Sequence, residues 1–394
     1  MDLLVRHIGR LHPIVTPVVK DAAVLIRDGS IAWLGSEQDL PSTSSEVLEL
    51  DVGGRTVTPG FVDAHTHLVW EGSRREEFVA RLSGQSYDGG GINTTVAATR
   101  AATDQQLIAS ATERAKSAIE HGTTTMEIKT GYGLTQADEM RMLAVIAELD
   151  RSLPLRVEST YLGAHVVPDR VDRDDYVDEV IASLPNAKAS GAQWCDVFCD
   201  EGVFTILETR RILTAAKDQG FGLRLHAEEI AHTGAAGLAA ELGCASADHL
   251  EHVSEADARA MAAAGVVGVL LPTVTLSLRT FAFGQVPTLK AAGVELALAT
   301  DCNPGTSWCE SMPYVIQLAC LVYGLTVEEA LAAATLGGAH SLRRDDVGHL
   351  AVGACGDLAV LDVDHEADLV AHLGASVVSN TVLGGRVWER QAGS

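Results

Sequence analysis

The segment Thr58-Pro59-Gly60-Phe61-Val62-Asp63-Ala64-His65-Thr66-His67 decides the fold and points to the chemistry. A short apolar run, introduced by Pro and Gly, ends in two histidines that are separated by a single residue. Because side chains alternate between the two faces of a strand, residues two apart project from the same face. We therefore expect His65 and His67 to direct two imidazole nitrogens, which are common metal ligands, toward one point at the end of a strand. The alternative is a surface strand that carries two histidines by chance.

Composition and charge restrict the classes of protein to which this chain can belong. It has 394 residues, 47% of them hydrophobic and 21% charged, so a large folded core is expected and disorder is not. Its 29 Lys and Arg stand against 53 Asp and Glu, and the net charge of −24 argues against nucleic acids and anionic membranes as partners. A small anionic substrate is compatible with this charge if a local Arg receives it.

Three features of the chain favour a cytoplasmic protein. The first ten residues, MDLLVRHIGR, contain neither a long apolar segment nor the small-residue cleavage site of a secretory signal. No uninterrupted apolar run reaches the roughly 18 residues that a membrane-spanning helix needs. The seven cysteines include no C-x-x-C pair, and we interpret them as buried thiols in a reducing compartment.

From residue 58 onward, apolar runs alternate with alanine-rich segments of helical period, which is typical of βα units and a parallel sheet. The expected strands are Gly60–Leu68, Thr123–Lys129, Leu155–Leu162, Cys195–Asp200, Gly222–His226, Ser246–His249, Val266–Pro272 and Val294–Asp301. The expected helices include Thr103–His121, Gln136–Leu149, Asp172–Leu184, Ile206–Gln219, Thr233–Leu242, Glu255–Ala264 and Thr326–Ala334. Eight such strands indicate a (β/α)8 barrel of the TIM type, and a doubly wound sheet is the alternative.

Both ends of the chain are interpreted as parts of one small β-domain. Residues 1–57 contain short strand-like runs, and the dipeptide Asp28-Gly29 between two of them is a hairpin signal. Residues 344–394 return to short strand-like runs. Because neither piece is long enough to form a core alone, we expect them to build a composite β-domain beside a barrel formed by residues 58–343.

The catalytic groups of such barrels lie where the strands end at their carboxyl side. His65 and His67 end the first expected strand, His226 ends the fifth, and Asp301 ends the eighth. Three imidazoles and a carboxylate suit a metal site that keeps one position open for water.

Further candidates for acid–base chemistry lie in the same loops. Glu229 follows His226 by three residues and can reach water at the metal, with Glu228 as the competing candidate. For either carboxylate the structural alternative is a solvated charge or a charge at a helix N-terminus. His249 ends the sixth expected strand and can orient that water or donate to a developing oxyanion. No G-x-S-x-G, Walker or dinucleotide-binding motif competes with this interpretation.

Together these residues resemble the amidohydrolase superfamily. The resemblance rests on P-G-F-V-D-A-H-T-H, on the histidines of strands five and six and on the aspartate of strand eight. Within the superfamily the chain is similar, over nearly its whole length, to the branch that opens the imidazolone ring in histidine breakdown. The segments that carry this narrower similarity are Glu127–Leu134, Tyr161–Pro168, His226–Glu229, Ala247–His252 and Thr300–Ser307.

The resemblance implies a metal-dependent hydrolase that acts on a non-peptide cyclic amide. The implied reaction cleaves the cyclic amide C–N bond of 4-imidazolone-5-propanoate and gives N-formimidoyl-L-glutamate. It further implies a homodimer, with Glu229 as general base and acid and His249 assisting. One zinc or iron ion (Zn²⁺, Fe²⁺ or Fe³⁺) per subunit is implied, bound by His65, His67, His226 and Asp301.

The resemblance also implies a set of substrate contacts. They are Arg74, Tyr87, Tyr132, His165, Asn303, Gly305 and Thr306. The propanoate of the substrate needs a fixed cation, and a guanidinium can bind a carboxylate through two hydrogen bonds. Without the resemblance, Arg74 would be interpreted as a surface residue of the loop that follows strand one.

The same residues are also compatible with other functions. An aminohydrolase that releases ammonia from a nitrogen heterocycle would share the metal ligands, and a metal-binding barrel without activity would need no base. Many superfamily members hold two metals through a carbamylated Lys on strand four. Because Cys195–Asp200 contains no Lys, we expect a single metal, and we interpret Lys129 at the end of strand two as structural.

Overall fold

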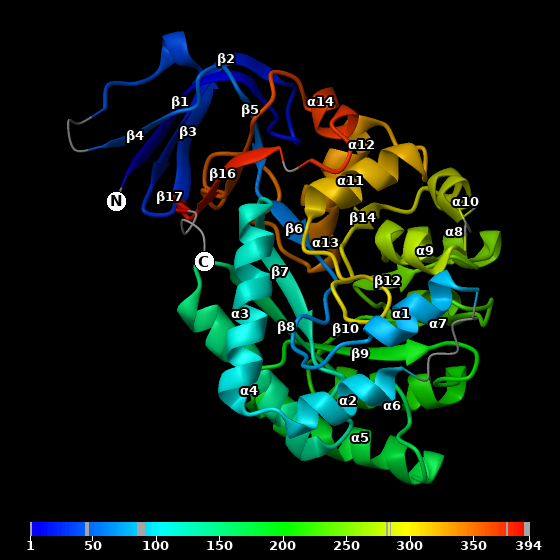
Figure 1. Cartoon of the computed structure of the whole chain (residues 1–394). Coiled ribbons are helices and arrows are strands. Elements are labelled where there is room, and N and C mark those ends of the chain that lie inside the picture. The colour runs from blue at the N-terminus through cyan, green and yellow to red at the C-terminus, as the bar shows by residue number, and fades with distance from the viewer. Residues whose placement is uncertain are drawn as a thin grey trace.

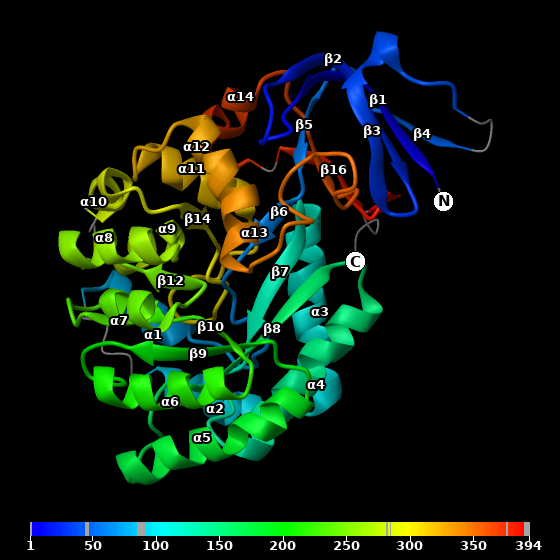
Figure 2. The same cartoon turned by 180° about the vertical axis from the view of Figure 1, so that it is seen from behind.

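The computed structural model describes residues 2–43, 47–84, 91–280, 283, 285–375 and 377–389. Two sheets organise the chain, a parallel barrel surrounded by helices and a second sheet at one end of it (Figure 1). Viewed from behind, the strands from the two ends of the chain again lie together in the second sheet, beside the barrel (Figure 2). No helix in the described part of the chain is long and apolar enough to span a membrane.

The barrel sheet has the order β14-β13-β12-β11-β9-β8-β7-β6, with β10 paired to β9, and every pairing in it is parallel. Its strands are β6 (Phe61–Asp63), β7 (Thr123–Lys129), β8 (Arg156–Ala164), β9 (Trp194–Cys199), β10 (Gly222–Leu223), β11 (His226–Ala227), β12 (Ser246–His249), β13 (Val267–Leu270) and β14 (Leu296–Leu298). Each expected run overlaps one of these strands, and the fifth contains β10 and the start of β11. The TIM-type barrel is therefore confirmed over the doubly wound alternative.

The barrel closes just beyond β6 and β14, at the residues of the opening motif. The amide of Asp301 donates to the carbonyl of His65, and the amide of His67 donates to the carbonyl of Cys302, both at 3.0 Å. Thr66 and Cys302 form a parallel bridge between these hydrogen bonds. Closure therefore brings the first and last predicted metal ligands, which are more than two hundred residues apart in the chain, onto adjacent backbones.

Helices cover the outside of the barrel (Figure 1). Those expected from the sequence correspond to α3 (Asp104–Glu120), α4 (Gln136–Ser152), α5 (Arg173–Ala189), α6 (Ile206–Asp218), α7 (Ala235–Leu242), α8 (Glu255–Ala264) and α12 (Val327–Ala332), which continues into a π-helical turn, η2 (Ala333–Gly337). Capping boxes start α3 at Thr103, α6 at Thr205 and α12 at Thr326, which explains why these helix starts were predictable.

The sequence did not predict the remaining helices of the described residues. They are α1 (Arg75–Leu82), α2 (Ile92–Ala101), α9 (Pro272–Leu278), α10 (Gln285–Ala292), α11 (Met312–Leu321), α13 (Gly338–Ser341) and α14 (Glu366–Ala371). α1 and α2 begin without a side-chain cap, and α1 buries none of its residues. No side-chain cap therefore marks the start of α1, and its apolar residues stay outside the core.

The second sheet joins the two ends of the chain in the order β17-β16-β15-β5-β1-β2-β3, with β4 paired to β1. Its N-terminal strands are β1 (Leu3–Leu11), β2 (Val19–Arg27), β3 (Ser30–Ser36), β4 (Leu48–Asp51) and β5 (Thr56–Pro59), with a short 3-10 turn, η1 (Glu37–Asp39), before β4. Its C-terminal strands are β15 (Leu358–Leu361), β16 (Val378–Leu383) and β17 (Arg386–Val387). The composite β-domain is thus confirmed. Its boundaries after residues 57 and 343 stay predictions, and β5 itself extends to Pro59.

The predicted Asp28-Gly29 hairpin forms between β2 and β3. Both turn residues have positive φ, 47° at Asp28 and 80° at Gly29, as a two-residue hairpin requires. Across the middle of the sheet β15 pairs antiparallel with β5, so that the C-terminal tail and the N-terminal segment share one hydrogen-bonded ladder.

Candidate functional site

The four predicted metal ligands converge at the carboxyl ends of the barrel strands. Oδ1 of Asp301 lies 3.5 Å from Nε2 of both His65 and His67, and Nε2 of His226 lies 3.4 Å from Nε2 of His67. All four side chains are buried, with at most 3% of their surface exposed. The barrel thus assembles three imidazoles and one carboxylate around one point.

The donor atoms of this cluster fit a metal ion. Nε2 of His65 and Oδ1 of Asp301 are buried and have no hydrogen-bond partner among the described residues, which is costly unless a ligand fills the space. Burial and neighbouring positive charges lower the pKa of His65 and His67 well below the usual value, so both rings are neutral and offer a lone pair. Three nitrogens and one oxygen suit zinc or iron.

Two buried carboxylates orient the imidazole rings of His65 and His226. Oδ2 of Asp248 lies 2.6 Å from Nδ1 of His65, and Oδ2 of Asp196 lies 3.0 Å from Nδ1 of His226. A carboxylate on Nδ1 fixes the proton on that nitrogen and leaves Nε2 as the ligand atom. Sequence reasoning assigned no role to either aspartate, although a charged residue within an apolar strand, as in β9 and β12, was an available signal.

These aspartates belong to a larger charge network inside the barrel. Nζ of Lys129 lies 2.8 Å from both Asp196 and Glu127, and the Arg224 guanidinium lies 3.2 Å from Asp248. Arg224 also donates to the carbonyls of Ala64 and Ser341. None of these side chains is exposed. Lys129, interpreted from the sequence as structural, is therefore the cation that links two barrel strands beneath the cluster.

Asp63, within the opening motif, fixes the other side of the cluster. Its carboxylate accepts hydrogen bonds from the amide and the hydroxyl of Thr300, at 3.0 and 2.7 Å. Burial raises the pKa of Asp63 to about 7, and the Thr300 hydrogen bonds partly oppose this shift. Because Thr300 directly precedes Asp301, Asp63 positions the carboxylate ligand, a role that the sequence did not reveal.

Glu229 and His249 face each other at the edge of the cluster. Oε2 of Glu229 lies 3.7 Å from Nε2 of His249, and the ring of His249 lies 5.3 Å from that of His226. Burial, together with the charges of Glu251 and Asp301, raises the pKa of Glu229 well above its usual value. Burial lowers the pKa of His249 well below its usual value. A carboxyl group with a raised pKa beside a neutral imidazole suits proton transfer near neutral pH.

The structure separates the two competing glutamates. Oε1 of Glu228 accepts a hydrogen bond from the amide of Gly234, at 2.8 Å, and lies 3.1 Å from Nδ1 of His232. Gly234 is the N-cap of α7, so Glu228 stabilises a helix N-terminus. Glu229 contacts His249 instead, so the two neighbouring carboxylates have different partners. The helix-terminal alternative therefore describes Glu228.

Glu251 lies in the loop between β12, which ends at His249, and α8, which begins at Glu255. Its carboxylate accepts from the hydroxyl of Thr275 at 3.0 Å and lies 4.0 Å from Nδ1 of His249. Burial raises the pKa of Glu251 to about 7. His249 thus lies between two acidic side chains, Glu229 on one ring nitrogen and Glu251 on the other.

Tyr132 and His165 form an aromatic wall beside the cluster. The ring of His165 stacks on that of His67 with 5.0 Å between centroids and lies 5.4 Å from the ring of Tyr132. The loop that carries Tyr132 is held by Glu139, whose carboxylate accepts from the amides of Gly131, Gly133 and Leu134. Burial lowers the pKa of His165 to about 3, so this ring is neutral.

Asn303 builds the loop that follows β14. Its Oδ1 accepts from the amides of Gly305 and Thr306, and its Nδ2 donates to the carbonyl of Asp301 and the hydroxyl of Thr306, all at 2.8 Å. A primary amide has two acceptor positions and two donor hydrogens, so the side chain of Asn303 is saturated. Its predicted contact with substrate requires one of these hydrogen bonds to exchange.

Arg74 reaches the same loop from the other side. It is buried and is the N-cap of α1, rather than part of a surface loop. Its Nε and Nη2 donate to the two oxygens of Glu77, at 2.8 and 2.7 Å. A Cβ on Gly305 would lie 2.1 Å from Nη1 of Arg74, so only glycine permits this approach. Tyr87, the remaining predicted contact, lies outside the described residues.

The arrangement agrees with what the chain resembles. Residues 56–388 match the model of the amidohydrolase family. The chain is 46% identical to the imidazolonepropionase of Mycolicibacterium smegmatis (strain ATCC 700084 / mc(2)155) over 94% of its own length and 92% of the relative's. It is 44% identical to that of Streptomyces coelicolor (strain ATCC BAA-471 / A3(2) / M145) over 95% and 92%.

Solved structures support the fold independently. An adenosine deaminase from Xanthomonas campestris with bound zinc superposes with a TM-score of 0.74 at 19% identity, covering 98% of this chain and 92% of the other. At this level of identity the likeness concerns the fold alone. The similarity to the relatives over nearly the full length is much closer, and the chain therefore belongs to the amidohydrolase family and, within it, to the imidazolonepropionases.

Proposed function

We propose that this chain hydrolyses the cyclic amide C–N bond of 4-imidazolone-5-propanoate to give N-formimidoyl-L-glutamate in L-histidine degradation. The observation that carries the reaction type is the convergence of Glu229 and His249, 3.7 Å apart, on the buried cluster of ligand-type side chains. The names of the relatives, which share 44–46% of the sequence over nearly its full length, support the choice of substrate.

One zinc or iron ion per subunit would be held by four residues, His65, His67, His226 and Asp301. Such an ion lowers the pKa of bound water toward about 7 and polarises a carbonyl oxygen. A second ion of the carbamylated-lysine kind has no ligand on β9, which contains no lysine. Lys129 is not available for that role because its ammonium is paired with Glu127 and Asp196.

Glu229 transfers the proton. Burial raises the pKa of Glu229, which favours the uptake of a proton by this carboxyl group. Oε2 accepts a proton from the attacking water and then delivers it to the ring nitrogen that leaves as the C–N bond breaks. His249 donates a hydrogen bond to the oxygen of the former carbonyl, on which negative charge develops.

The remaining residues hold the substrate. Arg74 binds the propanoate, and Glu77 fixes the plane of its guanidinium through two hydrogen bonds. Tyr132 and His165 contact the polar ring of the imidazolone. The loop at Gly305 and Thr306 provides further substrate contacts. A substrate that lacks these polar groups leaves buried donors and acceptors unpaired, which gives strong discrimination.

The variant Glu229→Gln tests the mechanism. We expect it to retain the metal content of the native protein while kcat falls by about 10²–10⁴, since the amide keeps the shape but accepts no proton. The matched control is Glu228→Gln, which changes the neighbouring carboxylate and should retain most of the turnover. Metal analysis and the ultraviolet absorbance of the imidazolone provide the two readouts. Turnover by Glu229→Gln equal to that of the native protein would refute the assignment of the base.

An ammonia assay separates this function from that of an aminohydrolase on the same scaffold. Native protein should consume 4-imidazolone-5-propanoate without releasing ammonia, whereas ammonia release without imidazolone turnover would identify an aminohydrolase. We further propose that the protein acts in the cytoplasm as a homodimer. Light scattering during size-exclusion chromatography tests the dimer, and a mass of one subunit would contradict it.

A further inference from the structure

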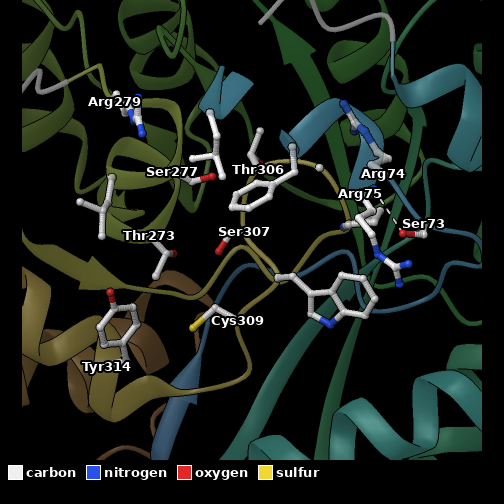
Figure 3. A pocket seen from close by; sticks show the side chains of 16 residues that line it. Ser73, Arg74, Arg75, Thr273, Ser277, Arg279, Thr306, Ser307, Cys309 and Tyr314 are labelled. Carbon is white, nitrogen blue, oxygen red and sulfur yellow. Dashed lines mark hydrogen bonds between the residues drawn. The ribbon is translucent and has the colours of Figure 1, made fainter. Parts of the chain in front are cut away.

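A large pocket opens beside the proposed substrate site. Its volume is about 580 Å³, and it lies between the start of α1, the helix α9 and the loop after β14 (Figure 3). Arg74, Gly305 and Thr306, which are predicted substrate contacts, form part of its wall. None of the predicted metal ligands lines it, so the pocket lies outside the catalytic cluster.

The pocket is positively charged in a strongly acidic protein. The net charge of the chain is −24, yet three arginines and no Asp or Glu are among the described residues that line the pocket. Arg74 is paired with Glu77, which leaves Arg75 and Arg279 as the unneutralised cations of the wall. Both are exposed and form no ion pair with any described residue, whereas cations elsewhere, such as Arg210, meet carboxylates.

Local stability does not explain the position of Arg75. It is the first residue of α1, where the positive end of the helix dipole disfavours a cation. Arg279 caps the C-terminus of α9, where the dipole favours a cation, but its φ of 57° is a left-handed conformation that favours glycine. Figure 3 shows the two side chains at different sides of the pocket. Because the position of Arg75 is unfavourable for its helix, we look for its role in binding.

We propose that Arg75 and Arg279 form an outer carboxylate subsite, which collects the anionic substrate before Arg74 takes over its propanoate. The inference rests on the proposed function, because that function supplies a substrate with a carboxylate. A protein of this net charge repels anions over a distance of about 10 Å at 0.1 M salt. Cations that line a cleft can reverse the sign of the local potential and raise the local concentration of an anion.

The apolar part of the wall supports the same role. Phe78, Leu276 and Trp308 line the pocket with 46%, 36% and 58% of their surface exposed. Trp308 is held edge-on against Trp70, with 5.8 Å between ring centroids. Low-dielectric walls strengthen the field of the arginines, and the exposed rings offer a surface to the flat heterocycle of the substrate.

The double variant Arg75→Gln/Arg279→Gln tests the subsite in the full-length, metal-loaded protein. At low ionic strength we expect kcat/KM to fall about 3- to 10-fold through a higher KM, with kcat within twofold of the native value. Added salt should lower kcat/KM of the native protein, because it screens an attraction, and should leave that of the variant unchanged or raise it.

The matched control is Lys20→Gln/Arg386→Gln, which removes the same charge from exposed positions in the second sheet. We expect native kcat/KM and native salt dependence from it. If the pocket variant retains the native KM and salt dependence, or if the control loses as much as the pocket variant, the outer subsite is refuted.

A binding measurement separates this inference from the proposed function. The probe is 3-(imidazol-4-yl)propanoate, which carries the same side chain but no bond to hydrolyse, and its neutral amide is the comparison. We expect calorimetry to show tighter binding of the acid to the native protein and a 3- to 10-fold loss for the pocket variant only. Charge-dependent binding without imidazolone turnover would refute the proposed function and support the subsite. Turnover without charge-dependent binding would refute the subsite alone.

Discussion

The two sheets of this molecule both bury apolar residues, but the barrel buries a charged network as well. Beneath the proposed metal cluster lie the fully buried ionisable residues of this network, Glu127, Lys129, Asp196, Arg224 and Asp248. Inside the second sheet lies an aliphatic core of equally buried residues that includes Leu11, Ile26, Val57, Leu358 and Val360. Both interiors exclude water, but the charged network gains no free energy from apolar burial.

The difference indicates what each interior is for. Replacing a buried ion pair by apolar residues of similar volume is often neutral or stabilising, so the charges in the barrel are not an efficient way to stabilise a fold. They contact the proposed ligands instead, through Asp248 on His65 and Asp196 on His226. The barrel interior orients ligands, while the second sheet contributes burial and ties the two ends of the chain together.

Breaking the charged interior should have the largest effect. The variant Lys129→Met leaves Asp196 and Glu127 without their shared cation, and removing one partner of a buried pair costs about 3–5 kcal/mol. We expect the free energy of unfolding, measured by urea denaturation, to fall by this amount, and metal content to fall with it because Asp196 loses its position against His226.

A surface pair provides the control for this variant. Lys116 lies 3.1 Å from Glu113 on the exposed side of α3, and Lys116→Met should change the free energy of unfolding by less than about 1 kcal/mol. Native stability and native metal content in Lys129→Met would show that the charged interior has no part in holding the ligands.

Breaking the aliphatic interior should affect stability alone. Leu11→Ala removes a fully buried side chain from the second sheet, and such truncations cost about 2–5 kcal/mol. Because Leu11 lies outside the proposed site, we expect kcat and metal content at 25 °C to match the native protein. Leu48→Ala, at a position that is 53% exposed in β4 of the same sheet, should cost less than about 0.5 kcal/mol. A loss of metal from Leu11→Ala would contradict the claim that the interior of the second sheet affects stability alone.

The same contrast explains which parts of the structure could be predicted from the sequence. The barrel strands and half of the described α-helices follow local patterns, and the capping boxes at Thr103, Thr205 and Thr326 carry their own signal. The proposed ligands follow from the rule that barrel chemistry lies at strand ends, so His65, His226 and Asp301 needed only the strand assignment. The confirmed barrel therefore places them on one rim.

The contacts beneath and around the ligands were not predictable in this way. Whether Asp196 meets His226 depends on the register between β9 and β11, which periodicity alone does not specify. The saturation of Asn303 depends on the turn that its own loop adopts, with hydrogen bonds to Gly305 and Thr306. Glu228 and Glu229 are adjacent and chemically identical, and only their contacts in the folded chain, with Gly234 and with His249, separate their roles.

The smallest expected effect concerns a buried charge at the edge of the second sheet, Glu366. Unlike the charges inside the barrel, it is not part of the network around the proposed metal ligands. Glu366 at the start of α14 accepts two hydrogen bonds from Arg10 of β1, at 2.7 and 2.6 Å, and lies 3.0 Å from Nε2 of His12. Burial opposes ionisation here, but these partners outweigh it and lower the pKa of Glu366 to about 2.

The pKa of Glu366 is lower in the folded protein than its ordinary value of 4.5, so the stabilisation from its charge is complete above pH 4.5. It is lost as the pH falls toward 2, because the folded protein must then accept a proton that the unfolded chain already carries. We expect Glu366→Gln to lower the free energy of unfolding by about 1 kcal/mol at neutral pH. The difference from the native protein should shrink as acid is added, whereas metal content and kcat at neutral pH stay native. A difference that is constant down to the lowest pH would mean that the hydrogen bonds of Glu366, and not its charge, join α14 to β1.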